Sequence, residues 1–190
     1  MLKKLGSTII VMAALVALLS VSVMGLFTDT ASVPANTFAT GTVDISTSPV
    51  SALVTFSGMA PGDQVTAPVT VTNAGTLQLR YAVTSSTTEN TLAGQLDLTI
   101  KSGVTTCTNA GFGTDGTVVY ATGDLGSTTG VNVVGDPAQG AQAGDRTLNA
   151  SANEVVCFNV SLPSSTGNTF QGLTTTATFS YQAEQTTNNP

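Results

Sequence analysis

The 190-residue sequence contains no histidine. Histidine is the base in Ser-His-Asp and Cys-His catalytic sites and a ligand in the H-E-x-x-H zinc helix, so all three are excluded. No two carboxylates are adjacent in the chain, so no acid–base pair can be named. A hydroxyl nucleophile with Lys101 as its base would need a desolvated lysine, and its neighbours look like the water-facing side of a strand. The sequence therefore predicts no catalytic residue, no metal ligand and no cofactor.

Charge is also scarce, at 8% of residues. After residue 25 the basic side chains are Arg80, Lys101 and Arg146, against eleven carboxylates, which gives 3 − 11 = −8. A surface of this sign repels phosphates, so nucleic acid is excluded as a partner. Thr, Ser, Asn, Gln and Gly must solvate most of the surface. This composition fits an ordinary low-charge secreted protein, and equally a surface that lies against copies of itself with little repulsion.

A single long apolar segment stands at the amino terminus. Lys3 and Lys4 precede an almost unbroken apolar run over residues 8–19, and the small residue Gly25 follows. This order is typical of a secretory signal peptide, so we expect residues 1–25 to be removed by cleavage between Gly25 and Leu26. The alternative is a retained anchor, because residues 5–26 are about the roughly 20 residues that span a bilayer. If the signal is cleaved, the membrane is a partner only through the signal and only before cleavage.

Beyond residue 37 the chain reads as strands separated by turns. Apolar residues alternate with polar ones in five stretches, which indicates antiparallel sheets with one buried and one water-facing side. Turn sequences such as Pro61-Gly62-Asp63 separate them. We predict an all-β fold, a single antiparallel β-sandwich over residues 37–185, with a polar tail over residues 186–190. The alternating stretches lie near residues 65–71, 77–83, 96–100, 156–162 and 177–183; residues 38–46 and 50–57 are further candidates, and residues 88–94 a short helical turn.

Residues 102–150 form a Gly-rich insert with two short apolar stretches, 118–120 and 131–134. Loops of this length are usually functional or mobile. Asp115, Asp124, Asp136 and Asp145 lie in it, but their spacing does not match an EF-hand, and aspartates in turns normally bond their own backbone.

Two cysteines, Cys107 and Cys157, remain in a chain expected outside the cell, where an even count favours a disulfide. Cys157 is also out of phase with the core-facing Val156 and Phe158. We therefore predict a bridge from the outer face of that strand to the loop at Cys107. Closing that loop constrains the unfolded chain by roughly 4 kcal/mol.

Several short motifs, in order, resemble the TasA/camelysin family of secreted bacterial proteins. They are Gly25, Phe27 and Asp29, followed by Phe-Ala-Thr-Gly-Thr-Val-Asp-Ile at residues 38–45. Pro-Gly-Asp at 61–63, Asn-Ala-Gly-Thr at 73–76 and the strand at 176–185 are similar to later family motifs. The resemblance implies a jelly-roll sandwich and release by a signal peptidase of the SipW type. It also implies an extracellular matrix or bacterial cell-surface location.

In that family the segment after the signal is donated to the next subunit, which builds a filament. Carried over by position, residues 26–36 are the donor strand here, with Leu26, Phe27 and Val33 as anchors. The chain's first partner is then itself, with another matrix protein as a further possibility. Three hypotheses follow: a filament subunit of a biofilm matrix, a monomeric secreted adhesion or accessory module whose amino terminus folds back on itself, and a camelysin-type peptidase.

Overall fold

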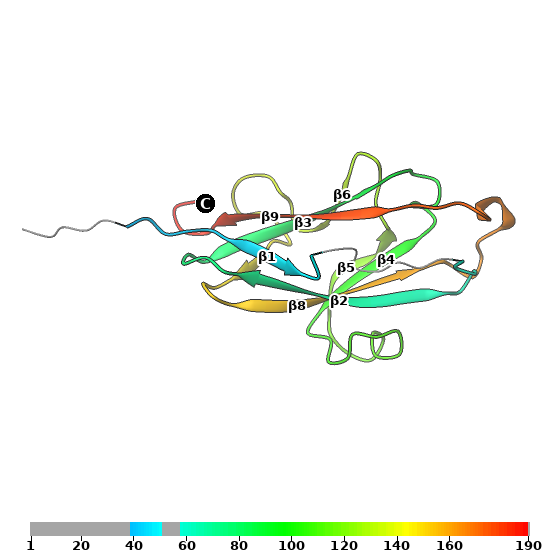
Figure 1. Ribbon diagram of the computed structural model, residues 1–190, viewed down its shortest axis with the longest axis horizontal. Helices are drawn as coiled ribbons and strands as arrows, with labels where there is room; N and C mark the ends of the chain where they lie inside the picture. The colour runs from blue at the N-terminus through cyan, green and yellow to red at the C-terminus, as the bar shows by residue number, and fades with distance from the viewer. Residues whose placement is uncertain (1–38, 51–57, 190) are drawn as a thin grey trace, which may run out of the picture. The chain divides into compact units, whose positions relative to one another are not determined.

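The computed structural model describes residues 39–50 and 58–189, and residues 40–190 form one compact unit. Within them, two antiparallel sheets pack face to face (Figure 1). The first sheet has the order β1 (Ile45–Ser48), β2 (Gln64–Asn73), β8 (Asn153–Ser161), β4 (Asp97–Ser102) and β5 (Thr117–Asp124). The second is built on β3 (Leu79–Thr87), which pairs with β9 (Ala177–Gln185) along one edge and with β6 (Val131–Val134) and β7 (Arg146–Leu148) along the other. The predicted all-β sandwich is confirmed.

The core follows the alternation read from the sequence, because successive side chains of a strand point to opposite faces of a sheet. On β3, Leu79, Tyr81 and Val83 are all buried, and on β4 so are Leu98 and Ile100. The remaining buried apolar side chains of this cluster come from β2, β6, β7, β8 and the segments beside them: Val69, Val71, Leu96, Leu125, Val133, Val134, Leu148, Val156, Phe158 and Leu162.

Four local details differ from the sequence-based expectations or lie beyond them. The first strand begins at Ile45, although we expected it over residues 38–46. The candidate strand at 50–57 lies outside the described residues, apart from Val50. Residues 88–94 form hydrogen-bonded turns, with the N–H of Gly94 donating to the carbonyl of Asn90 at 3.0 Å. The expected tail lies against β3, where the N–H of Thr186 donates to the carbonyl of Gln78 at 3.2 Å.

One long side of the sandwich is closed by contacts between the sheets, and we call it the closed side. It comprises β5, β6 and residues 125–130. The Ser85 hydroxyl donates to the carbonyl of Leu125 at 2.6 Å. The N–H of Thr87 donates to the carbonyl of Ser127 at 2.9 Å, and Leu125 itself is buried. The segment that follows β5 in the first sheet is therefore bonded to β3 of the second sheet. No helix among the described residues is long and apolar enough to cross a membrane.

Candidate functional site

The outer edge of β9 pairs with no strand in the part of the chain that the structure describes. In an antiparallel pair, alternate residues point their backbone N–H and C=O groups at the partner strand. Thr176 and Thr186, which flank the strand, bond toward β3 at 3.1 and 3.2 Å, so the even-numbered residues face β3. The odd-numbered residues point outward, and none of them is proline: Ala177, Phe179, Tyr181, Ala183 and Gln185.

A second unpaired edge lies on β2. Because β1 pairs only with residues 70–73, no described strand borders residues 64–68 on that side. The N–H of Asn73 donates to Ala152 beside β8 at 2.9 Å, and the N–H of Ala74 donates to Asp44 beside β1 at 2.8 Å. Even-numbered residues therefore point away from β8. Pro68 fits this orientation, because proline has no N–H and is tolerated where that position faces away from the ladder.

These two edges lie on the same side of the sandwich, which we call the unpaired side (Figure 1). Phe158 of β8, the strand next to β2, packs against Phe179 of β9 with ring centroids 4.8 Å apart. The inward side chains here are only half-buried: Val65 and Ala67 on β2, and Phe179 and Tyr181 on β9. The described strands therefore leave apolar surface of the core incompletely covered on this side.

Tyr181 carries an additional polar group on the unpaired side. Its ring lies beside that of Tyr81, with centroids 6.1 Å apart. Its hydroxyl is buried and has no hydrogen-bond partner among the described residues, and burial raises its pKa well above the usual value. Buried hydroxyls are normally hydrogen-bonded, so this one is a candidate to receive a partner from another chain.

At one end of the sandwich, residues 40–44 are held by the turn at residues 73–77, and we call this arrangement the amino-terminal clamp. The N–H groups of Thr76 and Leu77 both donate to the carbonyl of Thr42, at 3.1 and 3.2 Å. In return, the N–H of Thr42 donates to the Thr76 hydroxyl at 2.9 Å. A Cβ on Gly75 would lie 2.4 Å from the carbonyl oxygen of Thr42, so only glycine permits this approach. Two motifs that lie far apart in the sequence thus meet in space.

Asn73 holds the turn of the clamp in place. It is fully buried, and its side-chain amide donates to the carbonyls of Leu77, Leu148 and Asn149 at 2.8, 3.2 and 3.0 Å. Its carbonyl oxygen accepts the N–H of Gly75 at 2.9 Å. Because leaving buried polar groups unsatisfied is costly, this residue fixes where the chain enters β1. The sequence signalled the motif but not this role.

The three basic side chains of the sandwich are all used internally. Arg80 pairs with Glu184 (Nε to Oε1, 2.6 Å), and Arg146 pairs with Glu154. Lys101 donates to the carbonyls of Phe112 and Asp115 at 2.8 and 3.2 Å and lies over the Phe112 ring. Lys101 lies on the outer face of β4, where residues 103–116 fold over it and leave it half-buried. No hydroxyl is hydrogen-bonded to its amine among the described residues.

The two cysteines form the predicted disulfide, with Cα atoms 5.7 Å apart. Cys157 is buried but does not belong to the core cluster, which contains its neighbours Val156 and Phe158. The phase argument from the sequence is thus confirmed. The bridge fastens residues 103–116, which we call the disulfide loop, to the outer face of the five-stranded sheet. This loop bulges from the lower face of the molecule in Figure 1.

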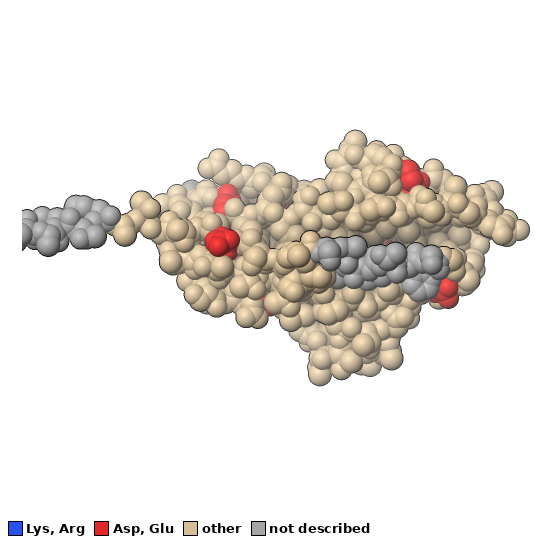
Figure 2. All heavy atoms as spheres, viewed as in Figure 1, with Lys and Arg blue, Asp and Glu red and all other residues tan. Residues whose placement is uncertain are grey.

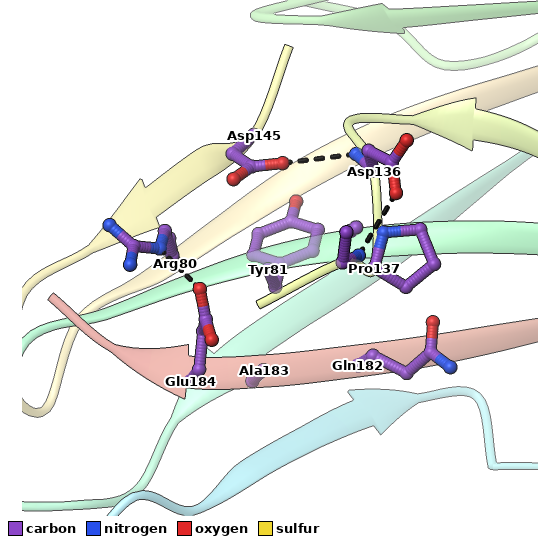
Figure 3. A pocket seen from close by; sticks show the side chains of 10 residues that line it. Arg80, Tyr81, Asp136, Pro137, Asp145, Gln182, Ala183 and Glu184 are labelled. Carbon is purple, nitrogen blue, oxygen red and sulfur yellow. Dashed lines mark hydrogen bonds and ion pairs between the residues drawn. The ribbon is translucent and has the colours of Figure 1, made fainter. Parts of the chain in front are cut away.

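A small pocket of about 100 Å³ lies on the outer face of the second sheet, beneath the loop at residues 136–145 (Figure 3). Its carboxylates are already occupied. Asp145 accepts the N–H groups of Asp136 and Gln142 at 3.0 and 2.8 Å, and Glu184 accepts from Arg80 and from the N–H of Gly140. The carboxylates of the pocket therefore hold the loop at residues 136–145 in place. This role explains why aspartates recur in the insert.

The surface drawn in Figure 2 carries few charged groups, and its acidic residues are scattered over it. A model of the camelysin metallo-endopeptidase family matches residues 1–189. The chain belongs to the camelysin family. Proteins of this family are extracellular or associated with the cell surface. No curated protein matches the chain.

The name metallo-endopeptidase implies a catalytic metal, which needs several ligands close together. The sequence has no histidine, and both cysteines are consumed by the disulfide. Among residues 39–50 and 58–189 no three His, Cys, Asp or Glu side chains gather in a metal-binding arrangement. Zinc sites need such convergent nitrogen, sulfur or oxygen ligands. The described residues of this camelysin-family chain therefore do not fit a zinc centre.

The sequence-predicted donor residues lie outside the described part of the camelysin-family chain. They are Leu26, Phe27 and Val33, together with the cleavage position at Gly25. What the structure adds is the point where their segment joins the sandwich, at the clamp, and the two unpaired edges. Those edges were missed from the sequence, because alternation identifies strands but not their neighbours.

Proposed function

We propose that this camelysin-family protein is a secreted structural subunit that polymerises head-to-tail into extracellular filaments. Residues 26–36 of one subunit add as a strand to the unpaired side of the next. The role is structural and not catalytic. The observation that carries the proposal is the outer edge of β9, a row of backbone groups that no described strand pairs, beside half-buried Phe179 and Tyr181.

Strand addition suits this edge for two physical reasons. Backbone N–H and C=O groups of an edge strand are a template for another strand. The incoming strand also brings apolar side chains, and burying a Val or Phe side chain contributes about 1.5–3 kcal/mol. Apolar Leu26, Phe27 and Val33 would supply them to the partly covered core, and a polar donor group would satisfy the Tyr181 hydroxyl.

The amino-terminal clamp supports the same function on the subunit that donates the strand. Because Thr42 is fixed by the turn at residues 73–77, the preceding segment starts from a defined position. A strand that leaves one subunit and enters another at a different surface makes a heterologous contact, which forms open fibres unless the rotation closes a ring. The few surface charges also allow subunits to approach with little repulsion.

Secretion completes the proposal. The signal at residues 1–25 would direct export, and a signal peptidase of the SipW type would expose Leu26 as the new amino terminus. The filament would then lie in the matrix or at the surface of a bacterial cell, with a second matrix protein as a possible further partner.

Electron microscopy of the mature chain, starting at Leu26, tests this function beside a chain starting at Thr37. We expect filaments from the former and single particles from the latter. A point variant removes the ambiguity of truncation: Val33→Asp places a charge on a proposed anchor, and Ser32→Asp places the same charge one residue away. Val33→Asp should raise the critical concentration at least about tenfold, equivalent to about 1.4 kcal/mol, and Ser32→Asp much less.

Single particles from both the Leu26 and Thr37 forms, over a range of salt and protein concentration, would contradict polymerisation. They would favour the monomeric adhesion module instead. Filaments from the Thr37 form would contradict the role of residues 26–36. Peptidase activity that a chelator abolishes would revive the enzyme hypothesis.

A further inference from the structure

The disulfide loop is fastened at three points to the outer face of the first sheet. Cys107 is bonded to Cys157, which lies opposite Pro68 of β2 in the strand register. Lys101 of β4 holds the carbonyls of Phe112 and Asp115. The third point is on the unpaired edge of β2. There the Asn109 side-chain amide donates to the carbonyl oxygen of Gln64 at 2.8 Å.

The bond from Asn109 uses a group that strand addition would need. Gln64 is even-numbered, so its backbone groups point away from β8, toward the unpaired edge. An incoming strand would have to donate an N–H to this carbonyl, which is already occupied. Four residues along, Pro68 offers no N–H to that strand. The β2 edge is thus closed at its Gln64 end and interrupted at its Pro68 end.

The β9 edge has neither obstacle. From Ala177 to Ala183 its outward residues include no proline, and no side chain of the described residues bonds to their outward backbone groups. Only the carbonyl of Gln185, at the last position, accepts a bond, from the Asn189 side chain at 3.3 Å. One edge of the unpaired side is therefore protected against pairing and the other is not.

We propose that the disulfide loop caps the outer edge of β2 through Asn109, and so confines strand addition on the unpaired side to β9. This inference rests on the proposed function and specifies its acceptor. Natural sheets protect edges with prolines and covering loops because an unprotected edge pairs with any available strand. A filament subunit with two open acceptor edges could receive two donors, or one donor in either sheet. On the unpaired side, the cap leaves β9 as the acceptor that faces the half-buried core, and hence one donor per subunit there.

Residue-resolved amide hydrogen exchange on assembled filaments tests the cap, with the non-assembling Val33→Asp chain as the unpolymerised reference. In filaments of the unmodified chain, amide exchange at Phe179 and Tyr181 should be at least about a hundredfold slower than in the reference chain. Exchange at Gln64 and Thr66 should stay within about twofold of the reference. In Asn109→Ala filaments the Gln64 and Thr66 amides should slow about five- to tenfold or more, because the edge now accepts a strand.

Two further variants keep the test decisive. Thr105→Ala alters an exposed side chain of the same loop but keeps the backbone N–H of Thr105, which donates to the Asp115 carboxylate at 3.2 Å. This variant should behave as the unmodified chain does. Replacing Cys107 and Cys157 with serine releases the loop, and should expose the β2 edge more than Asn109→Ala.

Each other result overturns the inference. Slow Gln64 and Thr66 amides in the unmodified filament, or already in the reference chain, would mean that β2 is occupied despite the loop. Fast amides at these positions in both Asn109→Ala and the cysteine variant would mean that the loop is no cap. If amide exchange slowed at neither edge in the filaments, strand addition itself would be refuted, and the proposed function with it. This outcome differs from the two above, so failure of the cap and failure of the proposed function can be told apart.

Discussion

The two long sides of the sandwich differ in hydrogen bonding and in how well their apolar side chains are covered. A sheet that ends must satisfy its edge groups and cover the apolar side chains beneath them. On the closed side, Ser85 and Thr87 bond across to residues 125–127, and Leu125 is buried. On the unpaired side, within the described residues, β9 has no such contacts and Phe179 stays half-buried. An additional strand can therefore add on the unpaired side without displacing any of the described strands.

The same comparison explains why a proline appears where it does. Pro68 lies on β2 with its ring nitrogen directed away from β8, where it removes no hydrogen bond of the sheet. An equivalent proline on β9 would likewise leave the pairing with β3 intact, since odd-numbered residues of β9 point outward. Such a proline would convert the unprotected edge into a protected one.

The largest effect is therefore expected from Ala183→Pro, which removes one outward N–H in β9. The subunit should remain folded, because proline is tolerated at outward positions of edge strands. Assembly should be abolished or its critical concentration raised at least about a hundredfold, because the donor loses a ladder bond and meets the proline ring. Ala183→Val, which keeps the N–H, is the matched control, and light scattering with microscopy measures both. Unchanged assembly by Ala183→Pro would mean that β9 is not the acceptor.

A second, smaller effect compares how much a core substitution on each side lowers the free energy of unfolding. Leu125→Ala, on the closed side, should lower the free energy of unfolding of the single subunit by about 2–4 kcal/mol, the usual range for a buried leucine. Phe179→Ala should cost the single subunit less, about 1–2 kcal/mol, because its ring is only half-buried there. In the filament the order should reverse, with Phe179→Ala weakening assembly more. Urea denaturation of the Val33→Asp background gives the first comparison and critical concentrations give the second.

Equal losses from the two substitutions in the single subunit would mean that the unpaired side is as well packed as the closed side. Then no apolar surface would remain to drive strand addition, and the comparison between the sides would fail.

The strands themselves were predictable from the sequence, because burial on one face leaves a period of two that is visible in residues such as Leu79, Tyr81 and Val83. The disulfide was predictable for the same reason, from the phase of Cys157. The neighbours of each strand were not, since pairing depends on contacts between distant residues. Gly75 illustrates this limit: its motif was noticed, but its need for a missing side chain arises from Thr42, more than thirty residues away. The cover over Lys101 was not predictable either, because the loop that forms it follows later in the chain and leaves no periodic signal.

The smallest expected effect concerns the carboxyl-terminal end of β9. Glu184 accepts hydrogen bonds from Arg80 and from the N–H of Gly140, and the bond from Arg80 holds the pKa of this carboxyl below its usual value. Because the pKa is lower in the folded chain than in the unfolded one, the pair stabilises the fold above the unfolded value, near 4.3. That contribution is lost as the pH falls through the folded pKa.

Glu184→Gln should therefore destabilise the subunit slightly at neutral pH, and the difference from the unmodified chain should shrink as the pH falls from about 5 to 3. The effect stays small because the carboxylate is partly exposed and solvent screens the pair. Asp124→Asn, a carboxylate-to-amide change on the closed side and outside both ion pairs, is the matched control. Urea denaturation between pH 3 and 7 measures all three chains. If the Glu184→Gln and unmodified curves run parallel, the Arg80 pair does not fasten β9, and the edge must owe its position to the pairing with β3 alone.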